Sequence, residues 1–200
     1  MIPFNHLGFI FKLFASLIYP TRAKKDLADI VTPMKTGSTV LDIGSGTGIL
    51  TQFVYEVRKD LAHICFDPAP GMLKYVPAYA HKVEGRAEEL PFCDKAFNII
   101  LIGDALHHLN DPPQAIAGIM RCLDRNGTLF IFDIDPGKFM GRFICRLEAL
   151  LNEPAHFYEP EELRRLLIGY GCAVEIRNYG WRYAIIASGA KNFNYLPFKA

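Results

Sequence analysis

The chain has 200 residues, of which 50% are hydrophobic and 22% are charged, and its formal net charge is +1. This length suffices for one sizeable core but is short for two, so we expect a single domain over residues 1–200. Lysine and arginine are mixed among aspartate and glutamate, so no basic surface of the kind that binds nucleic acid is expected.

The cysteines are scattered along the chain without a CxxC pair. Several lie within apolar runs, so we expect buried free thiols in a reducing, cytoplasmic compartment rather than disulfides. The same spacing argues against a zinc site, and no metal is expected. The residues are Cys65, Cys93, Cys122, Cys145 and Cys172.

The N-terminal segment, residues 2–19, is apolar and aromatic, but two polar residues and a lysine interrupt it. It is therefore too short and too broken to span a bilayer, and it lacks the basic start and cleavage site of a signal peptide. Its apolar residues recur at helical spacing, which predicts a helix packed on the domain. A mobile lid over an apolar substrate, or a surface in peripheral contact with a membrane, is the open alternative. With a second helix after Pro20, residues 1–32 form an N-terminal helical segment.

The next stretch joins a strand, a glycine turn and a helix. Val40–Ile43 is an apolar run typical of a buried strand, and Ile49–Val54 follows a helical pattern. Gly44, Gly46 and Gly48 lie between them. Glycines are needed in such a turn because a Cβ would block close approach of the backbone to a ligand. The stretch therefore predicts the nucleotide-cradling corner of an α/β domain.

The details of this turn point away from a dinucleotide. The dinucleotide fingerprint has its third glycine three residues after the second, where this chain has Ile49. Asp42 stands just before the turn, where its charge would repel a pyrophosphate. The same carboxylate suits a ligand with an ammonium group, since opposite charges attract strongly in a partly dry cleft. A cofactor that joins adenosine to an amino acid without phosphate, S-adenosylmethionine, fits better than NAD.

Further strands and helices alternate along the chain. Asp67 ends the second predicted strand, and Asp104 follows the fourth. Asp111 is expected to cap a helix, and Asn126-Gly127 to form a turn. Apolar strands alternating with helices indicate a parallel sheet covered on both faces. The predicted strands are 63–66, 82–84, 97–102 and 128–134.

The last third of the chain departs from this alternation. Residues 137–170 are predicted to be a mostly helical insertion before two β-rich runs, 173–179 and 182–188. Gly180-Trp181 joins those runs, and so short a connection suits an antiparallel pair at the edge of the sheet.

Four motifs, in this order, resemble the class I S-adenosylmethionine-dependent methyltransferases, in particular their type 11 small-molecule branch. They are VLDIGSGTG, FDPAPGML, GRAEELPFCDKAFNIILIGDALHHLNDP and LDRNGTLFIFDIDPG, and they run from about Val40 to Pro136. The resemblance implies an α/β, Rossmann-like three-layer sandwich. Its sheet would be mostly parallel and seven-stranded, with an antiparallel last strand.

The resemblance also implies a set of cofactor-binding residues. Asp42 and the glycine turn would hold the methionine part of S-adenosylmethionine, and Asp67 the ribose hydroxyls. Pro68 or Met72 would flank the adenine, and Ala87 would contact its edge. Asp104 and Ala105 would lie where the transferred methyl meets the substrate. The full set is Asp42, Gly44, Ser45, Gly46, Gly48, Asp67, Pro68, Met72, Arg86, Ala87, Glu88, Asp104 and Ala105.

Some of these assignments have alternatives. The family usually has an acidic residue where this chain has Arg86, so either Glu88 replaces it or packing holds the adenine. Asp42 could instead cap the helix that follows it. His107, His108 and Asp104 are candidate proton acceptors, although the histidine pair could equally be structural.

The predicted reaction is direct displacement, in which a nucleophile of the acceptor takes the methyl group. The apolar N-terminus and the stretch Lys138–Arg146 favour a small, apolar or lipid-like acceptor. A non-catalytic S-adenosylmethionine-binding or regulatory protein of the same fold is the main alternative. Ile49 and Asp42 disfavour an NAD-dependent dehydrogenase.

Overall fold

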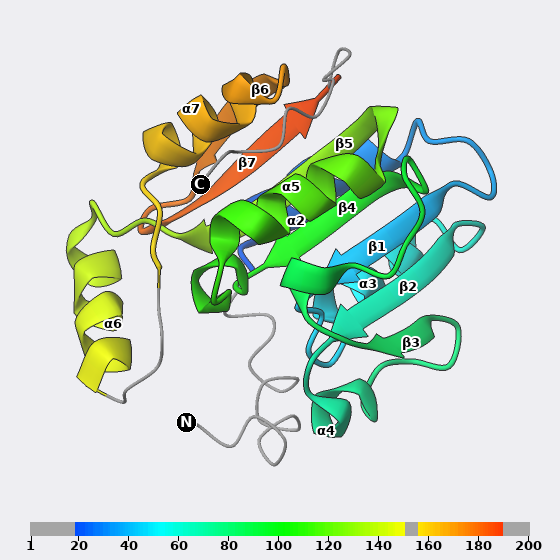
Figure 1. Ribbon diagram of the computed structural model, residues 1–200, viewed down its shortest axis with the longest axis horizontal. Helices are drawn as coiled ribbons and strands as arrows, with labels where there is room; N and C mark the ends of the chain where they lie inside the picture. Colours follow the sequence, from blue (N-terminus) through cyan, green and yellow to red (C-terminus); the bar gives the residue numbers. More distant parts are fainter. Residues whose placement is uncertain (1–18, 151–155, 190–200) are drawn as a thin grey trace.

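The computed structural model describes residues 19–150 and 156–189 of the chain (Figure 1). The helix predicted over residues 2–19 lies almost wholly outside the described residues. The second predicted helix of that segment is present as α2, Thr21–Val31. None of the helices within the described ranges is long and apolar enough to cross a membrane.

The strands form one seven-stranded sheet in the order β3-β2-β1-β4-β5-β7-β6. All the pairings from β3 to β5 are parallel, and β7 runs antiparallel to both of its neighbours. The predicted fold class is confirmed. The strands are β1 (Thr39–Ile43), β2 (Ala62–Asp67), β3 (His81–Glu84), β4 (Phe97–Gly103), β5 (Leu123–Ile134), β6 (Ala173–Asn178) and β7 (Arg182–Ser188).

Helices cover both faces of the sheet. In Figure 1, α5 crosses the near face, and α2 and α3 lie behind the strands. A side chain of Asp111 accepts a hydrogen bond from the Gln114 amide at the start of α5, which is the predicted cap. The further helices are α3 (Ile49–Val57), α4 (Pro70–Leu73), α5 (Pro112–Cys122), α6 (Phe139–Leu150) and α7 (Pro160–Gly169), with 3-10 turns η1 (Ala87–Glu89) and η2 (Leu106–His108).

β4 is apolar at every position from Ile99 to Ile102 because each face of the sheet has its own core. Ile100 and Ile102 of β4 pack in the core on the α5 side, whereas Ile99 and Leu101 pack in the core on the α2 and α3 side. Successive side chains of a strand point to opposite faces, so a strand covered twice loses the polar alternation of a half-exposed one. All four side chains are fully buried.

The predicted turn at Asn126-Gly127 is wrong, because these residues belong to β5. The pairing of β4 with β5 shifts register there: Phe97 is opposite Leu123, but Ile99 is opposite Thr128. The extra residues of β5 are accommodated as an irregularity of the strand. A Cβ on Gly127 would lie 2.8 Å from Leu123 Cδ1, so glycine permits the chain to pass close to itself here.

The strand order indicates which edge of the sheet binds a ligand. β1, β2 and β4 are parallel neighbours, so their carboxyl ends meet at the same edge. The strand order reverses direction between β1 and β4, and ligands of open α/β sheets bind in the crevice at such a switch point. In Figure 1, α6 stands beyond this edge, apart from the sheet.

Candidate functional site

A cavity of about 460 Å³ opens at this switch point, within the size range of small-molecule sites. It is lined by the ends of β1, β2 and β4 and by residues of η1, η2 and α6. Every predicted site residue except Gly48 lines it. The predicted residues on the cavity wall are Asp42, Gly44, Ser45, Gly46, Asp67, Pro68, Met72, Arg86, Ala87, Glu88, Asp104, Ala105, His107 and His108.

The glycine turn forms the floor of this cavity. The amides of Gly44 and Ser45 donate to the carbonyl oxygen of Phe66 at 2.8 and 3.2 Å, which ties the end of β1 to the end of β2. Gly44 has a φ of +63°, and a Cβ there would lie 2.5 Å from the Cβ of Ala105. Gly48 has a different role, because it begins α3 in the left-handed conformation. A Cβ on Gly48 would meet Val76 rather than a ligand.

Asp42 is buried beneath the turn and supports the helix that follows. Its Oδ2 accepts hydrogen bonds from the amide and the hydroxyl of Thr51, at 3.1 and 2.8 Å. Burial raises the pKa of Asp42 to about 7, against the opposing effect of the Thr51 hydrogen bonds. The helix-supporting role considered from sequence is therefore present, and it coexists with a place on the cavity wall.

Asp67 lies across the turn from Asp42. Its Oδ2 accepts from the Gly46 amide at 2.7 Å, and its Oδ1 accepts from the Ala69 amide at 2.8 Å. Burial raises the pKa of Asp67, and these two hydrogen bonds oppose that rise. Each carboxylate oxygen can accept more than one hydrogen bond, so Asp67 can hold the turn and still accept from a ligand hydroxyl.

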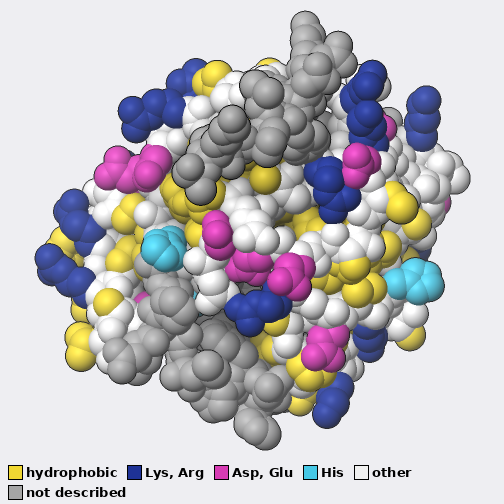
Figure 2. All heavy atoms as spheres, in the orientation of Figure 1, with side chains coloured by type: hydrophobic (Ala, Val, Ile, Leu, Met, Phe, Trp, Pro, Cys, Tyr) yellow, Lys and Arg dark blue, Asp and Glu magenta, His cyan; other side chains and the backbone are white. Residues whose placement is uncertain are grey.

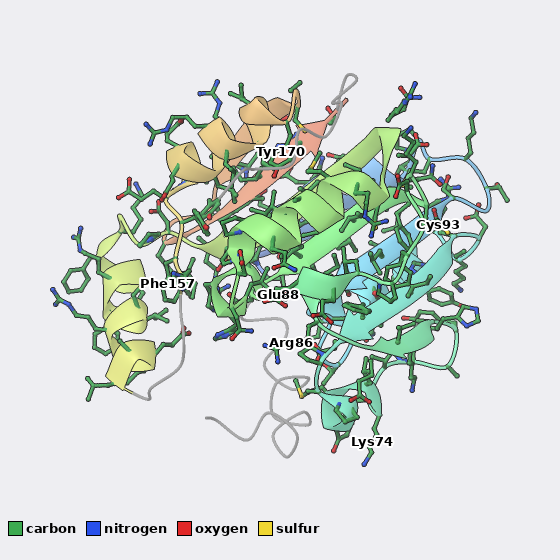
Figure 3. The ribbon with its side chains drawn as sticks, viewed as in Figure 1. Lys74, Arg86, Glu88, Cys93, Phe157 and Tyr170 are labelled. Atoms are coloured by element: carbon green, nitrogen blue, oxygen red, sulfur yellow. The ribbon has the colours of Figure 1, made fainter. Side chains whose placement is uncertain are left out.

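Arg86, which stands where the family usually has an acidic residue, lies at the η1 end of the cavity. The exposed side chain of Arg86 lies 3.9 Å, Nε to Oε2, from Glu88. Glu88 Oε1 accepts from the amides of Asn110 and Asp111 at 2.8 and 3.3 Å, which fastens it to the start of α5. Figure 3 shows Glu88 beside that end of α5, with Arg86 beyond it. Glu88 Oε1 is thus occupied by backbone amides of the fold, so the side chain is only partly available to a ligand.

Asp104 lies at the other end of the cavity from η1. It has a left-handed φ of 56°, and its carboxylate pairs with both terminal nitrogens of the buried Arg182, the longer contact being 3.2 Å. The Arg182 guanidinium also stacks 4.3 Å from the ring centroid of Trp181. Both carboxylate oxygens of Asp104 are thus engaged by Arg182, which leaves them less available to a substrate.

His107 is buried next to Asp104 within a group of carboxylates. Its Nδ1 lies 2.6 Å from Asp133 Oδ1, and its Nε2 lies 3.7 Å from Glu148 Oε2. The ring of Phe157 stacks on it, with 4.6 Å between the ring centroids. Burial lowers the pKa of His107, but Asp133 and the other carboxylates outweigh it and raise that pKa to about 9. His107 is therefore an imidazolium at neutral pH.

Four residues of this site were not among the site residues predicted from the sequence. Two signals in the sequence could have revealed the partners of His107. One is a carboxylate within an apolar run, Asp133, and the other is the only acidic residue of α6, Glu148. Arg182 follows Trp181 in the last strand pair, and its pairing with Asp104 spans 78 positions, which no local pattern reveals. Thr47 Oγ1 is buried at the cavity and has no hydrogen-bond partner in the described part of the chain.

Comparison with known proteins shows what this arrangement is similar to. Residues 41–131 match the family model described as a methyltransferase domain. Over this segment, which is a little under half of the chain, the protein is similar to the class I S-adenosylmethionine-dependent methyltransferases. The matched segment runs from β1 into β5, so it contains the glycine turn, Asp67, η1 and η2.

Curated relatives of this chain are methyltransferases by name. The chain is 31% identical over 109 residues to the ubiquinone/menaquinone biosynthesis C-methyltransferase UbiE of Vibrio campbellii, a match over 50% of this chain and 42% of that protein. It is 30% identical over 135 residues to the UbiE of Idiomarina loihiensis, over 62% of this chain and 50% of that one. The chain thus spans half, or less, of the length of these relatives.

Solved structures share the fold of this chain. A chain of the complex between the Haloferax volcanii Trm112 methyltransferase activator and a methyltransferase superposes with a TM-score of 0.78 at 15% identity, covering 94% of this chain and 97% of that one. A SAM-dependent methyltransferase from Aquifex aeolicus superposes with a TM-score of 0.63 at 18% identity, covering 89% and 97%.

The cavity fits S-adenosylmethionine, the cofactor of the matched family. A turn without Cβ atoms at Gly44 and Gly46 leaves room for the backbone to approach a ligand. The orphan hydroxyl of Thr47 is a free hydrogen-bonding group at that turn. Two carboxylates, at Asp42 and Asp67, suit an ammonium group and a ribose diol, and neither suits a pyrophosphate.

Proposed function

We propose that the protein transfers a methyl group from S-adenosylmethionine to a small, apolar acceptor that carries an ionised hydroxyl group. The observation that carries this proposal is the position of His107. A buried imidazolium, held by Asp133, lines the same cavity as the predicted cofactor residues. A fixed positive charge in a dry site stabilises an oxyanion of the substrate much more strongly than it would in water.

On the donor side, the residues of the cavity hold and orient the methyl donor. We assign Asp42 to the ammonium group of the methionine part and Asp67 to the ribose hydroxyls, as the motifs imply. Bound S-adenosylmethionine supplies a methyl group on a positively charged sulfur, which is already activated for displacement. In-line positioning of such reactants can supply on the order of seven kcal/mol of the barrier. The tie between Gly46 and Asp67 keeps the two halves of the donor site in register.

On the acceptor side, the raised pKa assigns His107 a donor role. An imidazolium with a pKa of about 9 has no free lone pair at neutral pH, so it cannot accept a proton from the substrate. It can donate a hydrogen bond to an acceptor oxygen that is ionised, as in a phenolate. Charge on such an oxygen makes the neighbouring ring carbon nucleophilic, and the names of the UbiE relatives favour methylation of carbon. When that carbon takes the methyl group, its own proton leaves to water and the aromatic ring is restored.

The acceptor class rests mainly on this chain's own residues. The family match ends at residue 131, before α6 and before Arg182. Glu148 of α6 and Arg182, the partner of Asp104, therefore lie beyond the matched segment. The exposed apolar residues of α6, among them Phe139 and Phe143, support the apolar, lipid-like character of the acceptor.

Two measurements test the proposal. Titration calorimetry should detect binding of S-adenosylhomocysteine and none of NAD; the reverse result would refute the cofactor assignment. Transfer of a labelled methyl group should then be screened over phenols and quinols, lipid amines and small amines. We expect turnover with the phenol and quinol set. Binding of S-adenosylhomocysteine without turnover on any acceptor would favour the non-catalytic alternative.

A further inference from the structure

Helix α6 attaches to the domain through one face only. Gly141 is buried, and a Cβ there would lie 1.9 Å from the carbonyl oxygen of Asp135, so glycine lets the helix pack tightly on the end of β5. Ile144, Cys145 and Glu148 are half-buried on the same face. Their spacing from Gly141, three, four and seven residues, is that of one side of an α-helix.

The opposite face of α6 is apolar and exposed. Phe139 is 80% exposed, Phe143 59%, Leu147 49% and Leu150 82%. Successive residues of a helix are about 100° apart, so these four side chains form one stripe within a quarter of the helix circumference. Large apolar side chains that are exposed singly need no explanation, but a contiguous stripe marks an interaction surface.

A basic stripe runs beside the apolar one. Lys138, Arg142 and Arg146 are exposed and four residues apart, which places them on the flank of the apolar stripe. Among the described residues, no carboxylate lies within 4.0 Å of their charged nitrogens; Arg142 donates only to the carbonyl oxygen of Gly137. Figure 2 shows hydrophobic and basic side chains together at the left edge of the molecule, where α6 lies in Figure 1.

We propose that the outer face of α6 binds the surface of an anionic lipid bilayer. The helix has the two features that interfacial helices combine: an apolar stripe to enter the acyl boundary and a basic flank to meet the headgroups. Its only acidic residue, Glu148, is on the inner face, so no negative charge opposes an anionic surface. The charge pattern is what favours a bilayer over a protein partner.

The other exposed amphipathic helix, α7, lacks this pattern. Its Arg164 pairs with Glu161 at 3.2 Å, and Ile168, 47% exposed, is its only large exposed apolar residue. The basic groups of α7 are therefore partly neutralised, and no apolar stripe accompanies them. This makes α7 the matched control for α6 within the same molecule.

Docking through α6 would place the cavity next to the bilayer. Glu148 lines the cavity on the inner face, and an α-helix is only about 10 Å across. The acceptor end of the site would then lie about one helix diameter from the headgroups, where an apolar acceptor is concentrated. This consequence rests on the proposed function. The binding of α6 to lipid does not, because it needs neither cofactor nor acceptor.

The test is co-sedimentation of the full chain with two kinds of vesicle. One kind is pure phosphatidylcholine and the other contains about one third phosphatidylglycerol. We expect binding to the anionic vesicles, weak binding to the neutral ones, and a loss of binding as added salt screens the charges. Equal binding to both vesicles, or binding to neither, would overturn the proposal whatever the methyl-transfer screen shows.

Variants of the two helices identify the surface. The double change Arg142→Gln and Arg146→Gln should weaken binding to anionic vesicles about thirtyfold, since each basic residue near such a surface contributes about fivefold. Phe143→Ser with Leu147→Ser should weaken it roughly tenfold or more. The α7 controls, Arg164→Gln with Arg165→Gln and Ile168→Ser alone, should bind as the parent does.

Equal losses in both helices would contradict the assignment to α6. The outward residues have few contacts to lose, so circular dichroism should show the same melting temperature for all variants. Light scattering of the parent chain without lipid tests the competing occupant, a second copy of the chain. A dimer that the change at Phe143 and Leu147 converts to monomer, without any lipid binding by the parent, would replace the bilayer by a protein partner.

Discussion

The carboxylate of Asp67 at the end of β2 accepts a 2.7 Å hydrogen bond from the amide of Gly46 in the turn after β1. Two sequence motifs that lie 21 positions apart are thereby joined directly. The contact means that Asp67 has two tasks: it shapes the glycine turn, and by the family resemblance it receives the ribose. Any change at this residue must affect both.

Replacing Asp67 by alanine should weaken the binding of S-adenosylhomocysteine and also loosen the turn. The change removes the acceptors of two backbone amides, Gly46 and Ala69. Each buried donor left unpaired costs about 1–3 kcal/mol, so the free energy of unfolding should fall by roughly 2–4 kcal/mol. Calorimetry gives the affinity, and urea unfolding gives the stability. Glu84→Gln, at the paired position of β3 and outside the cavity, is the control and should change neither. Unchanged affinity in Asp67→Ala would refute the ribose assignment.

Replacing Gly44 by alanine tests whether the contact of a new Cβ with Ala105 lowers stability and cofactor binding beyond the effect of the positive φ. Gly44 and Gly180 both have positive φ, +63° and +77°, so alanine at either should cost about 1–2 kcal/mol. Only at Gly44 would the new Cβ collide, 2.5 Å from Ala105, whereas nothing lies within 4 Å at Gly180. We expect Gly44→Ala to be the more destabilising change and to abolish detectable binding of S-adenosylhomocysteine. Equal unfolding free energies for the two variants would show that the contact with Ala105 relaxes freely.

The sequence was sufficient for the donor side because its signals are local. The glycine turn, Asp67 and η1 each lie beside a strand whose apolar run is plain, and parallel pairing brings strand ends to one edge. The acceptor side could not be predicted in the same way. Arg182 reaches Asp104 from the last strand, and Asp133 reaches His107 from β5. Those contacts depend on the order of strands in the sheet, which apolar periodicity does not specify.

Two glycine positions show what spacing along the sequence does not reveal. Asn126-Gly127 has the composition of a turn, but the chain folds close to itself there as an irregularity within β5, where Leu123 to Thr128 lie opposite only Phe97 to Ile99 of β4. Gly48 reads as part of the ligand cradle by its spacing. In the structure it forms the left-handed start of α3, where Val76 lies against it. A glycine pattern shows where the backbone is unusual, not which side of it meets the ligand.

Replacing Asp133 by asparagine should lower the pKa of His107 and shift the pH dependence of stability. In the folded protein that pKa is about 9, above the ordinary value of a histidine near 6.5. Its stabilising effect is thus complete below about pH 6.5 and is lost as the pH rises through 9. In Asp133→Asn this loss should occur at lower pH, and breaking a buried pair should cost about 3–5 kcal/mol at pH 7.

Unfolding by urea across pH 6–10 measures this shift, and the histidine NMR signals report the pKa directly. His81→Gln is the control, because His81 is exposed on β3 and lies outside the cavity. Methyl transfer by the parent should also decline as the pH rises through about 9, when the proposed oxyanion donor is deprotonated. An NMR titration of His107 with an ordinary midpoint would contradict both expectations.

The buried charge of Asp42 should make cofactor binding dependent on pH. Its pKa is about 7 in the free protein, and an ammonium group bound beside it would favour the ionised form and lower that pKa. The affinity for S-adenosylhomocysteine should therefore fall as the pH drops below 7, by up to about tenfold per pH unit. Calorimetry in buffers of different ionisation enthalpy should detect protons released on binding.

The same raised pKa predicts that Asp42 destabilises the fold above pH 7, where its ionised form binds the cofactor most strongly. A carboxyl whose folded-state pKa is raised stabilises the fold below its unfolded pKa near 4, and that stability is lost as the pH rises through 7. Asp42→Asn avoids the buried charge while its amide oxygen can still accept from Thr51. We expect it to be more stable than the parent at pH 8, by roughly 2–4 kcal/mol, yet to bind S-adenosylhomocysteine more weakly and without the pH dependence. Thr51→Val is the matched test of the supporting hydrogen bonds and should lower the stability at pH 8. If Asp42→Asn were both less stable and equal in affinity, the carboxylate would be a structural cap alone.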